Sequence, residues 1–170
     1  STRVDASLVK APKQRDNRVE NKQIKEGKEP EGWSEHKRRQ KDVNARWTKK
    51  NGRSFYGDKN HLAVDVKRKL IRAYRVTAAS VHDSNVFEDL LGENSSRDVW
   101  ADSDYRAKEI LQRLSARGYR EHIQRKGNRN RKLTAWEQPG NRTRSRIRAR
   151  VARIFGVQAM KAGSTILRAI

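Results

Sequence analysis

Between residues 98 and 123 the spacing of the apolar side chains changes twice. Residues 98–101 form a short predicted strand, and residues 119–123 form another one after Gly118. Between the two strands, apolar residues recur at the i, i+3, i+4 and i+7 positions of one helix face: Ala107, Ile110, Leu111 and Leu114. Parallel strands joined by a helix imply an α/β sheet.

The first half of the chain has the pattern of antiparallel strands. We predict a strand at residues 3–9, and in residues 55–66 apolar side chains alternate as in a half-buried strand. A basic turn then leads into a strand over residues 70–77, which completes a hairpin, and into a short helix at 85–91. The expected fold is therefore α/β, with a mixed sheet of antiparallel hairpin strands and parallel strands, flanked by helices.

Residues 12–46 interrupt this pattern. Their apolar side chains are too sparse for a packed element, so we expect a polar, mobile insertion within a single domain that spans residues 1–170. Trp33 is the exception in this segment. It is either a surface anchor for a partner or a loop side chain folded back on the protein.

The net charge restricts the partners of this chain. Lys and Arg number 41 against 20 Asp and Glu, a formal charge of +21, and such an excess opposes compaction unless a polyanion neutralises it. Nucleic acid is the expected polyanion; ribosomal proteins, basic tails and proteins of acidic membrane surfaces are the alternatives. No apolar run approaches the roughly 20 residues of a spanning helix, and no signal segment opens the chain, so we expect a cytoplasmic protein without a membrane partner. Without Cys, any metal must be held by carboxylates, His or phosphate.

The last part of the chain carries much of the positive charge. Residues 125–142 are predicted to form a basic loop, and a helix is predicted to begin near Thr143. Arginines crowd the helix outside one apolar stripe: Ile147, Val151, Ile154 and Phe155. This helix should lie close to a polyanion.

Two aspartates occupy unusual positions. Asp5 lies inside the first strand between apolar neighbours, and Asp102 ends the strand at 98–101. Carboxylates at the ends of neighbouring strands can hold two divalent metal ions for displacement at phosphorus. The alternative is that each aspartate only caps the element that follows it.

Five segments, in order, carry a resemblance to a known family. They are VDASLVKAP, DVNARWTKKNGRSFYGDKNH, VTAASVHDSNVF, VWADSDYR and RSRIRARVARIFG. Together they resemble the catalytic domain of bacterial insertion-sequence transposases of the DDE type. The resemblance implies a ribonuclease-H-like fold, metal-dependent cleavage and strand transfer of DNA in transposition, and two Mg²⁺ or Mn²⁺ ions in an active relative. It also implies a homodimer on double-stranded DNA, a location at the bacterial nucleoid, and a separate N-terminal DNA-binding domain that this chain lacks.

The resemblance assigns the three catalytic positions. Asp5 and Asp102 correspond to the first two carboxylates and would hold the metal. The third should be a Glu in the family pattern of Tyr, two residues, Arg, three residues, Glu, six residues, Lys. This sequence has Ser145, Arg148, Ala152 and Ala159 at those places. Only the Arg agrees, so we expect impaired catalysis; the alternative function is a non-catalytic DNA-binding protein derived from a transposase.

Several basic side chains are candidates for contacts with DNA. Lys49 and Lys50 would grip phosphate while Trp47 stacks on a base, unless this segment is a hairpin approach whose Trp belongs to the core. The resemblance places Lys59 and His61 near the scissile phosphate, with a plain strand-edge role as the alternative. The remaining DNA-binding candidates lie in the second half of the chain: Arg106, Arg125, Lys126 and Arg148.

Overall fold

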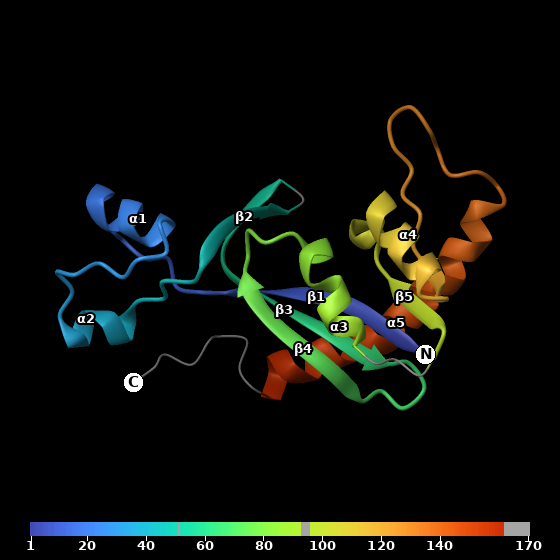
Figure 1. The fold of residues 1–170 in the computed structure, drawn as a ribbon, viewed down its shortest axis with the longest axis horizontal. Coiled ribbons are helices and arrows are strands. Elements are labelled where there is room, and N and C mark those ends of the chain that lie inside the picture. Colours follow the sequence, from blue (N-terminus) through green and yellow to red (C-terminus); the bar gives the residue numbers. More distant parts are fainter. Residues whose placement is uncertain (51, 93–95, 162–170) are drawn as a thin grey trace.

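The computed structural model describes residues 1–50, 52–92 and 96–161 (Figure 1). The side chains of residue 155 and of residues 157–161 lie outside this description. The elements, in chain order, are β1 (Thr2–Lys10), α1 (Arg18–Lys25), α2 (Glu35–Gln40), β2 (Arg46–Lys50), β3 (Arg53–Asp65), β4 (Ile71–Ala78), η1 (Asp83–Val86), α3 (Phe87–Leu91), β5 (Asp98–Ala101), η2 (Ser103–Tyr105), α4 (Lys108–Ala116), β6 (Arg120–Ile123) and α5 (Glu137–Lys161).

The strands form one mixed sheet, which confirms the predicted α/β class and is compatible with a ribonuclease-H-like fold. Its order is β2-β3-β1-β5-β6, and β4 also pairs with β3. β1 lies antiparallel to β3 and parallel to β5, and β5 lies parallel to β6. β1 is therefore the strand at which the antiparallel and parallel parts of the sheet meet.

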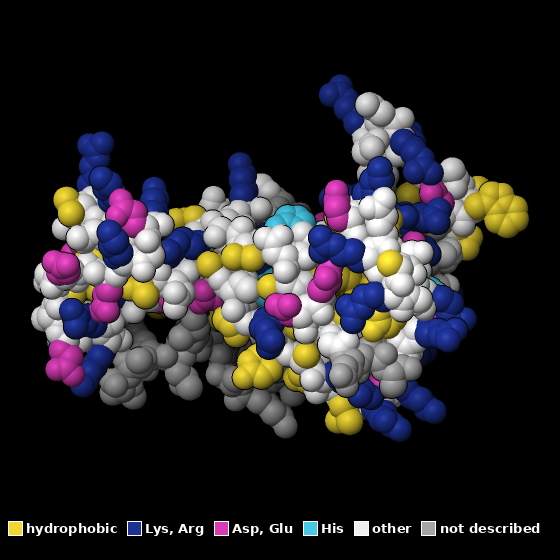
Figure 2. Space-filling model, in the orientation of Figure 1, with side chains coloured by type: hydrophobic (Ala, Val, Ile, Leu, Met, Phe, Trp, Pro, Cys, Tyr) yellow, Lys and Arg dark blue, Asp and Glu magenta, His cyan; other side chains and the backbone are white. Residues whose placement is uncertain are grey.

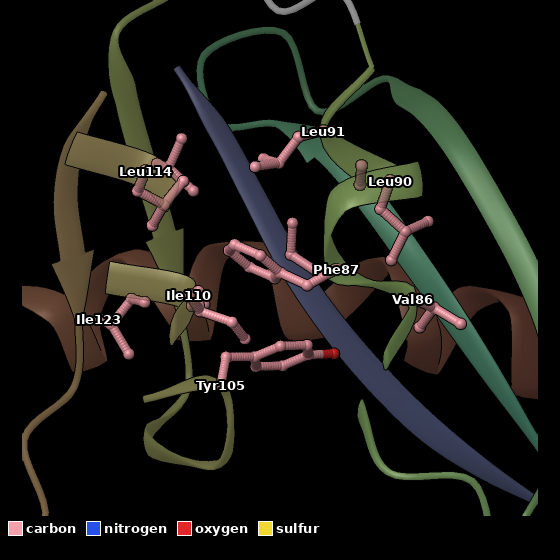
Figure 3. Packing of buried hydrophobic residues seen from close by; sticks show 12 residues of the cluster. Val86, Phe87, Leu90, Leu91, Tyr105, Ile110, Leu114 and Ile123 are labelled. Carbon is pink, nitrogen blue, oxygen red and sulfur yellow. The ribbon is translucent and has the colours of Figure 1, made fainter. Parts of the chain in front are cut away.

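One face of the sheet is packed by apolar residues of η1, η2, α3 and α4. Phe87 and Tyr105 lie side by side in this cluster, with their ring centroids 5.2 Å apart (Figure 3). Val4 and Ala63, which are opposite each other in the β1–β3 register, supply the floor of the cluster from the sheet. Burying a side chain of this kind contributes about 1.5–3 kcal/mol, so this face holds most of the apolar stabilisation.

The other face of the sheet is covered by α5. Here Val151 is fully buried against Leu62 and Val64, with Ile154 partly buried beside them. Side chains alternate along a strand, so Arg3 and Asp5 of β1 point to this same face as Leu62, which pairs with Asp5. The α5 face thus combines a small apolar contact with charged side chains.

The segment of residues 12–46 is folded, which corrects the expectation that it contains no packed element. Asn17 and Glu20 form a capping box at the start of α1. Trp33 is only 5% exposed, and its Nε1 donates to Glu20 Oε1 at 2.8 Å. Helix caps and the buried ring of Trp33 thus stabilise this segment in place of an apolar stripe. Figure 1 shows that α1 and α2 project beyond one end of the sheet.

The last helix begins at Glu137, six residues before the predicted start. Thr134 Oγ1 accepts from the Glu137 backbone N–H at 3.2 Å, and Glu137 Oε2 accepts from the Thr134 N–H at 3.0 Å. This reciprocal cap satisfies backbone groups at the helix start. Pro139 falls in the first turn, where its missing N–H costs no helical hydrogen bond. The predicted basic loop is shorter as a result.

Candidate active site

The strand register brings the two aspartates together. Arg3 of β1 is paired with Trp100 of β5 in the parallel ladder, and two residues further along each strand direction stand Asp5 and Asp102. Both carboxylates contact the guanidinium of Arg148 on α5. The distances are 3.8 Å from Nε to Asp5 Oδ2 and 2.9 Å from Nη1 to Asp102 Oδ2.

Asp5 is 7% exposed and belongs to a buried ion pair. Arg3 Nη2 donates to Asp5 Oδ2 at 3.2 Å, and the Ala6 backbone N–H donates to Asp5 Oδ1 at 3.0 Å. Arg3 itself is 0% exposed, and this burial lowers the pKa of its guanidinium while the charge of Asp5 opposes the shift. A buried charge is unfavourable unless an opposite charge lies beside it. Asp5 provides that charge for Arg3, so Asp5 has a structural role in addition to any role in chemistry.

Asp102 uses its two carboxylate oxygens differently. Its Oδ1 accepts from the backbone N–H of Ser103 at 2.5 Å and from the Ser103 hydroxyl at 3.1 Å, so it caps η2. Its Oδ2 faces Arg148. The capping role and the site role, which the sequence presented as alternatives, are compatible because each uses a separate oxygen.

Ala152 lies one turn beyond Arg148 on α5 and is exposed. Because Val151 is fixed in the apolar contact with the sheet, positions 148 and 152 share one edge of the helix. Ser145, on the preceding turn, accepts from Gln124 Nε2 at 2.9 Å. Ala159 lies where side chains are not described.

The carboxylates that could hold a metal are Asp5 and Asp102. Across the described parts of the chain, no group of three or more His, Cys, Asp or Glu side chains could hold a metal ion. The methyl group of Ala152 offers no ligand, and the guanidinium of Arg148 already lies between the two aspartates. The donor set therefore does not fit a site for two divalent ions.

Basic side chains line two cavities beside the aspartates. The first cavity, of about 210 Å³, adjoins the residues after Asp5, and its basic side chains are Lys49, Lys50 and Lys59. The second, of about 600 Å³, begins at Ser103, next to Asp102, and its basic side chains are Arg106, Arg125, Lys126, Arg131 and Lys132. Figure 2 shows Lys and Arg side chains standing out over much of the visible surface. The first cavity also has the carboxylates of Asp83 and Asp104 in its wall, so the second cavity is the more strongly basic place for phosphate groups.

Some of these cations already have protein partners. Lys59 Nζ lies 3.0 Å from Asp83 Oδ1 and donates to the Val81 carbonyl at 2.7 Å. Arg125 Nη1 donates to Glu137 Oε1 at 2.9 Å. Trp47 is 53% exposed, so it is not a core residue, and its ring lies beside the ring of Tyr56 and 5.6 Å from Lys13 Nζ.

His61 does not suit the contact with DNA that the resemblance implied. Its side chain is 0% exposed, and its Nε2 lies 2.8 Å from Thr77 Oγ1 of β4. Burial lowers the pKa of the ring, which favours the neutral form. The strand alternation that points Leu62 to α5 points His61 to the opposite face of the sheet, and this corrects the expectation.

Two site residues were missed in the sequence. Arg3 carries a charge among apolar strand residues and stands two positions before Asp5, so period-2 alternation would have placed both on one face. Glu137 accepts from Arg125 and from Arg131, both at 2.9 Å, and so orders the wall of the larger cavity. The Thr134 backbone N–H, followed by Arg125, lowers the pKa of Glu137 to about 2. The sequence T-x-x-E signals this cap.

Comparison with known proteins gives consistent results. Residues 2–161 match the family described as transposase DDE domain. The chain is also similar to the transposase for insertion sequence element IS1106 of Neisseria meningitidis serogroup B, with 35% identity over 117 residues. This match covers 68% of the chain and 40% of that relative, so the chain spans less than half of the relative's length. No solved structure matched. None of the helices in the described residues is long and apolar enough to cross a membrane.

Proposed function

We propose, since this chain belongs to the family of transposase DDE domains, that it is the catalytic domain of a bacterial insertion-sequence transposase and acts on double-stranded DNA. One observation carries the proposal. Asp5, on β1, and Asp102, directly after the neighbouring parallel strand β5, both lie next to the guanidinium of Arg148 on α5. In this proposal residues 1–170 act as one catalytic domain, into which residues 12–46 are inserted.

Asp5 and Asp102 would be the first two catalytic carboxylates, and position 152 the place of the third. The family generally depends on a divalent metal; Mg²⁺ or Mn²⁺ suits carboxylate oxygens. A relative with Glu at position 152 would offer three carboxylates for two such ions. This chain carries the methyl group of Ala152 there, so we expect its DNA cleavage and strand transfer to be impaired.

The DNA backbone would bind across the two basic cavities. Lys49, Lys50 and Lys59 would contact phosphates on one side of the aspartates, and Arg106, Arg125 and Lys126 on the other. Arg148 would join them once released from the aspartates. Such contacts hold and orient DNA without reading its sequence, and they weaken as salt rises. A homodimer that brings two element ends together, at the nucleoid, is part of the proposal.

The test is the Ala152→Glu variant on supercoiled plasmid DNA with Mn²⁺. Nicking is expected from this variant, and none from the matched Ala152→Gln variant, which has the same length without the charge. Adding Asp102→Asn to Ala152→Glu should remove the nicking. If the Ala152→Glu protein folds and binds DNA but does not nick it, the proposed cleavage site is wrong.

A second candidate function is DNA binding without catalysis. The observation in its favour is that Arg148 forms ion pairs with both aspartates, while position 152 has no carboxylate. DNA binding that is unchanged by Mn²⁺ and by EDTA, together with no nicking by Ala152→Glu, would favour this function. Tighter binding to duplex RNA than to duplex DNA at equal salt would exclude both candidates.

A further inference from the structure

We propose that the guanidinium of Arg148 is a built-in counterion of the Asp5–Asp102 pair, which a divalent cation has to displace before it can bind. The inference rests on the proposed function of the two aspartates. In this chain Arg148 would neutralise the two aspartates and control the access of cations to them.

The geometry directs one oxygen of each aspartate at the same cation. Asp5 Oδ1 and Asp102 Oδ1 are taken by the backbone N–H groups of Ala6 and Ser103. Asp102 Oδ2 lies 2.9 Å from Arg148 Nη1. Asp5 Oδ2 accepts from Arg3 Nη2 at 3.2 Å and also lies 3.8 Å from Arg148 Nε. A planar guanidinium presents several donors at once, so it can span two carboxylates as a metal ion does.

The charges of the cluster cancel. Asp5 and Asp102 carry one negative charge each, and Arg3 and Arg148 carry one positive charge each, which leaves no net charge. A divalent cation would thus approach a neutral cluster and would repel both guanidinium groups. A Glu at position 152 would give the same cluster a net negative charge, so the residue at that position sets how strongly the site attracts a cation.

Only one of the two arginines can leave. Arg3 has a side-chain exposure of 0% and is enclosed by the sheet and α5, whereas the side chain of Arg148 is 43% exposed. Val151 anchors α5 on the sheet. Arg148 can therefore turn out towards solvent by rotation of its own side chain, with the helix in place.

The test is a Mn²⁺ titration by calorimetry, without DNA, on the unaltered chain, on Arg148→Gln and on Arg146→Gln. Arg146 is exposed on the same helix, two residues earlier, and its substitution removes the same charge. Arg148→Gln should bind Mn²⁺ at least about tenfold more tightly than the unaltered chain, because a like charge next to the ion is gone. Mn²⁺ should also raise the melting temperature of Arg148→Gln alone.

Equal Mn²⁺ affinity of folded Arg148→Gln and of the unaltered chain would overturn the inference. So would an equal gain in Arg146→Gln, or a gain that persists after Asp102→Asn is added. If circular dichroism shows that Arg148→Gln is unfolded, Arg148→Lys decides. Lysine has a point charge that cannot span both carboxylates, so tighter Mn²⁺ binding than in the unaltered chain is expected, and unchanged binding contradicts the inference. The two experiments fail independently. If Arg148→Gln gains no Mn²⁺ affinity, nicking by Ala152→Glu still supports the proposed function; if Ala152→Glu does not nick, a gain in Mn²⁺ affinity still supports the counterion role of Arg148.

Discussion

The two faces of the sheet are stabilised in different ways. On the face covered by α3 and α4, the cluster around Phe87 and Tyr105 is apolar and closed. On the face covered by α5, the apolar contact of Val151 is small, and a row of ion pairs runs beside it. Apolar packing offers no group that binds metal or phosphate, whereas ion pairs can exchange partners with them. The division separates the part that holds the fold from the part that can respond to a ligand.

The largest expected effect concerns the apolar face. Phe87→Ala should lower the free energy of unfolding by about 3–5 kcal/mol, because it leaves a cavity in a closed cluster. Val151→Ala, at an equally buried position on the sheet-facing side of α5, should cost only about 1–2 kcal/mol, because it removes two methyl groups from a smaller contact. Urea unfolding of both variants measures the difference. Equal losses would show that the two faces contribute equally.

The next largest effect compares the two aspartates of the α5 face in their contribution to the free energy of unfolding. Asp5→Ala should cost about 3 kcal/mol, because it leaves the buried Arg3 without its carboxylate. Asp102→Ala should cost about 1 kcal/mol, because its partner Arg148 reaches solvent and the other loss is one cap. Thermal unfolding of the two variants at the same pH makes the comparison. A larger loss for Asp102→Ala would reverse the roles given to the two aspartates.

The smallest expected effect is the pH dependence of the stabilisation that Glu137 provides at the start of α5. The folded-state pKa of Glu137, about 2, lies below its ordinary value of 4.5. Ionised Glu137 therefore stabilises the fold above about pH 4.5, and this stabilisation is lost as the pH falls towards about 2. The difference in melting temperature between the unaltered chain and Glu137→Gln should be present at neutral pH and shrink in acid. Glu31→Gln, at an exposed position, is the control and should show no such trend.

The strands were predictable from the sequence, because period-2 alternation and the strand-helix-strand pattern are local signals. That Asp5 and Asp102 belong to one site was implied by the resemblance, because the pairing of β1 with β5 joins segments 97 residues apart. The helical spacing also placed Arg148 and Ala152 on a common edge. These are the parts of the site that depend on periodicity alone.

The remaining parts depend on contacts between distant residues. No periodicity indicates that Trp33 is buried by Glu20 and Lys37, since these side chains are polar and the contact is tertiary. The bridge from Arg148 to both aspartates likewise needs the relative position of α5 and the sheet. The start of α5 at the Thr134 cap is different, because the T-x-x-E signal was present within a segment that its basic residues made look like a loop.

The parallel register between β1 and β5 has a consequence for the order of folding. β1 pairs with β3 across 47 to 63 residues of sequence, whereas β5 joins β1 from the opposite side and across 97 residues. Contacts between distant segments close late, since more chain entropy is lost in forming them. On this argument Arg3 and Asp5 are in place on the antiparallel unit before Asp102, and Arg148 of α5, which is still further along the sequence, joins them later. An incompletely folded chain would hold half of the site, with its carboxylate already neutralised, and would present no reactive pair before the sheet is whole.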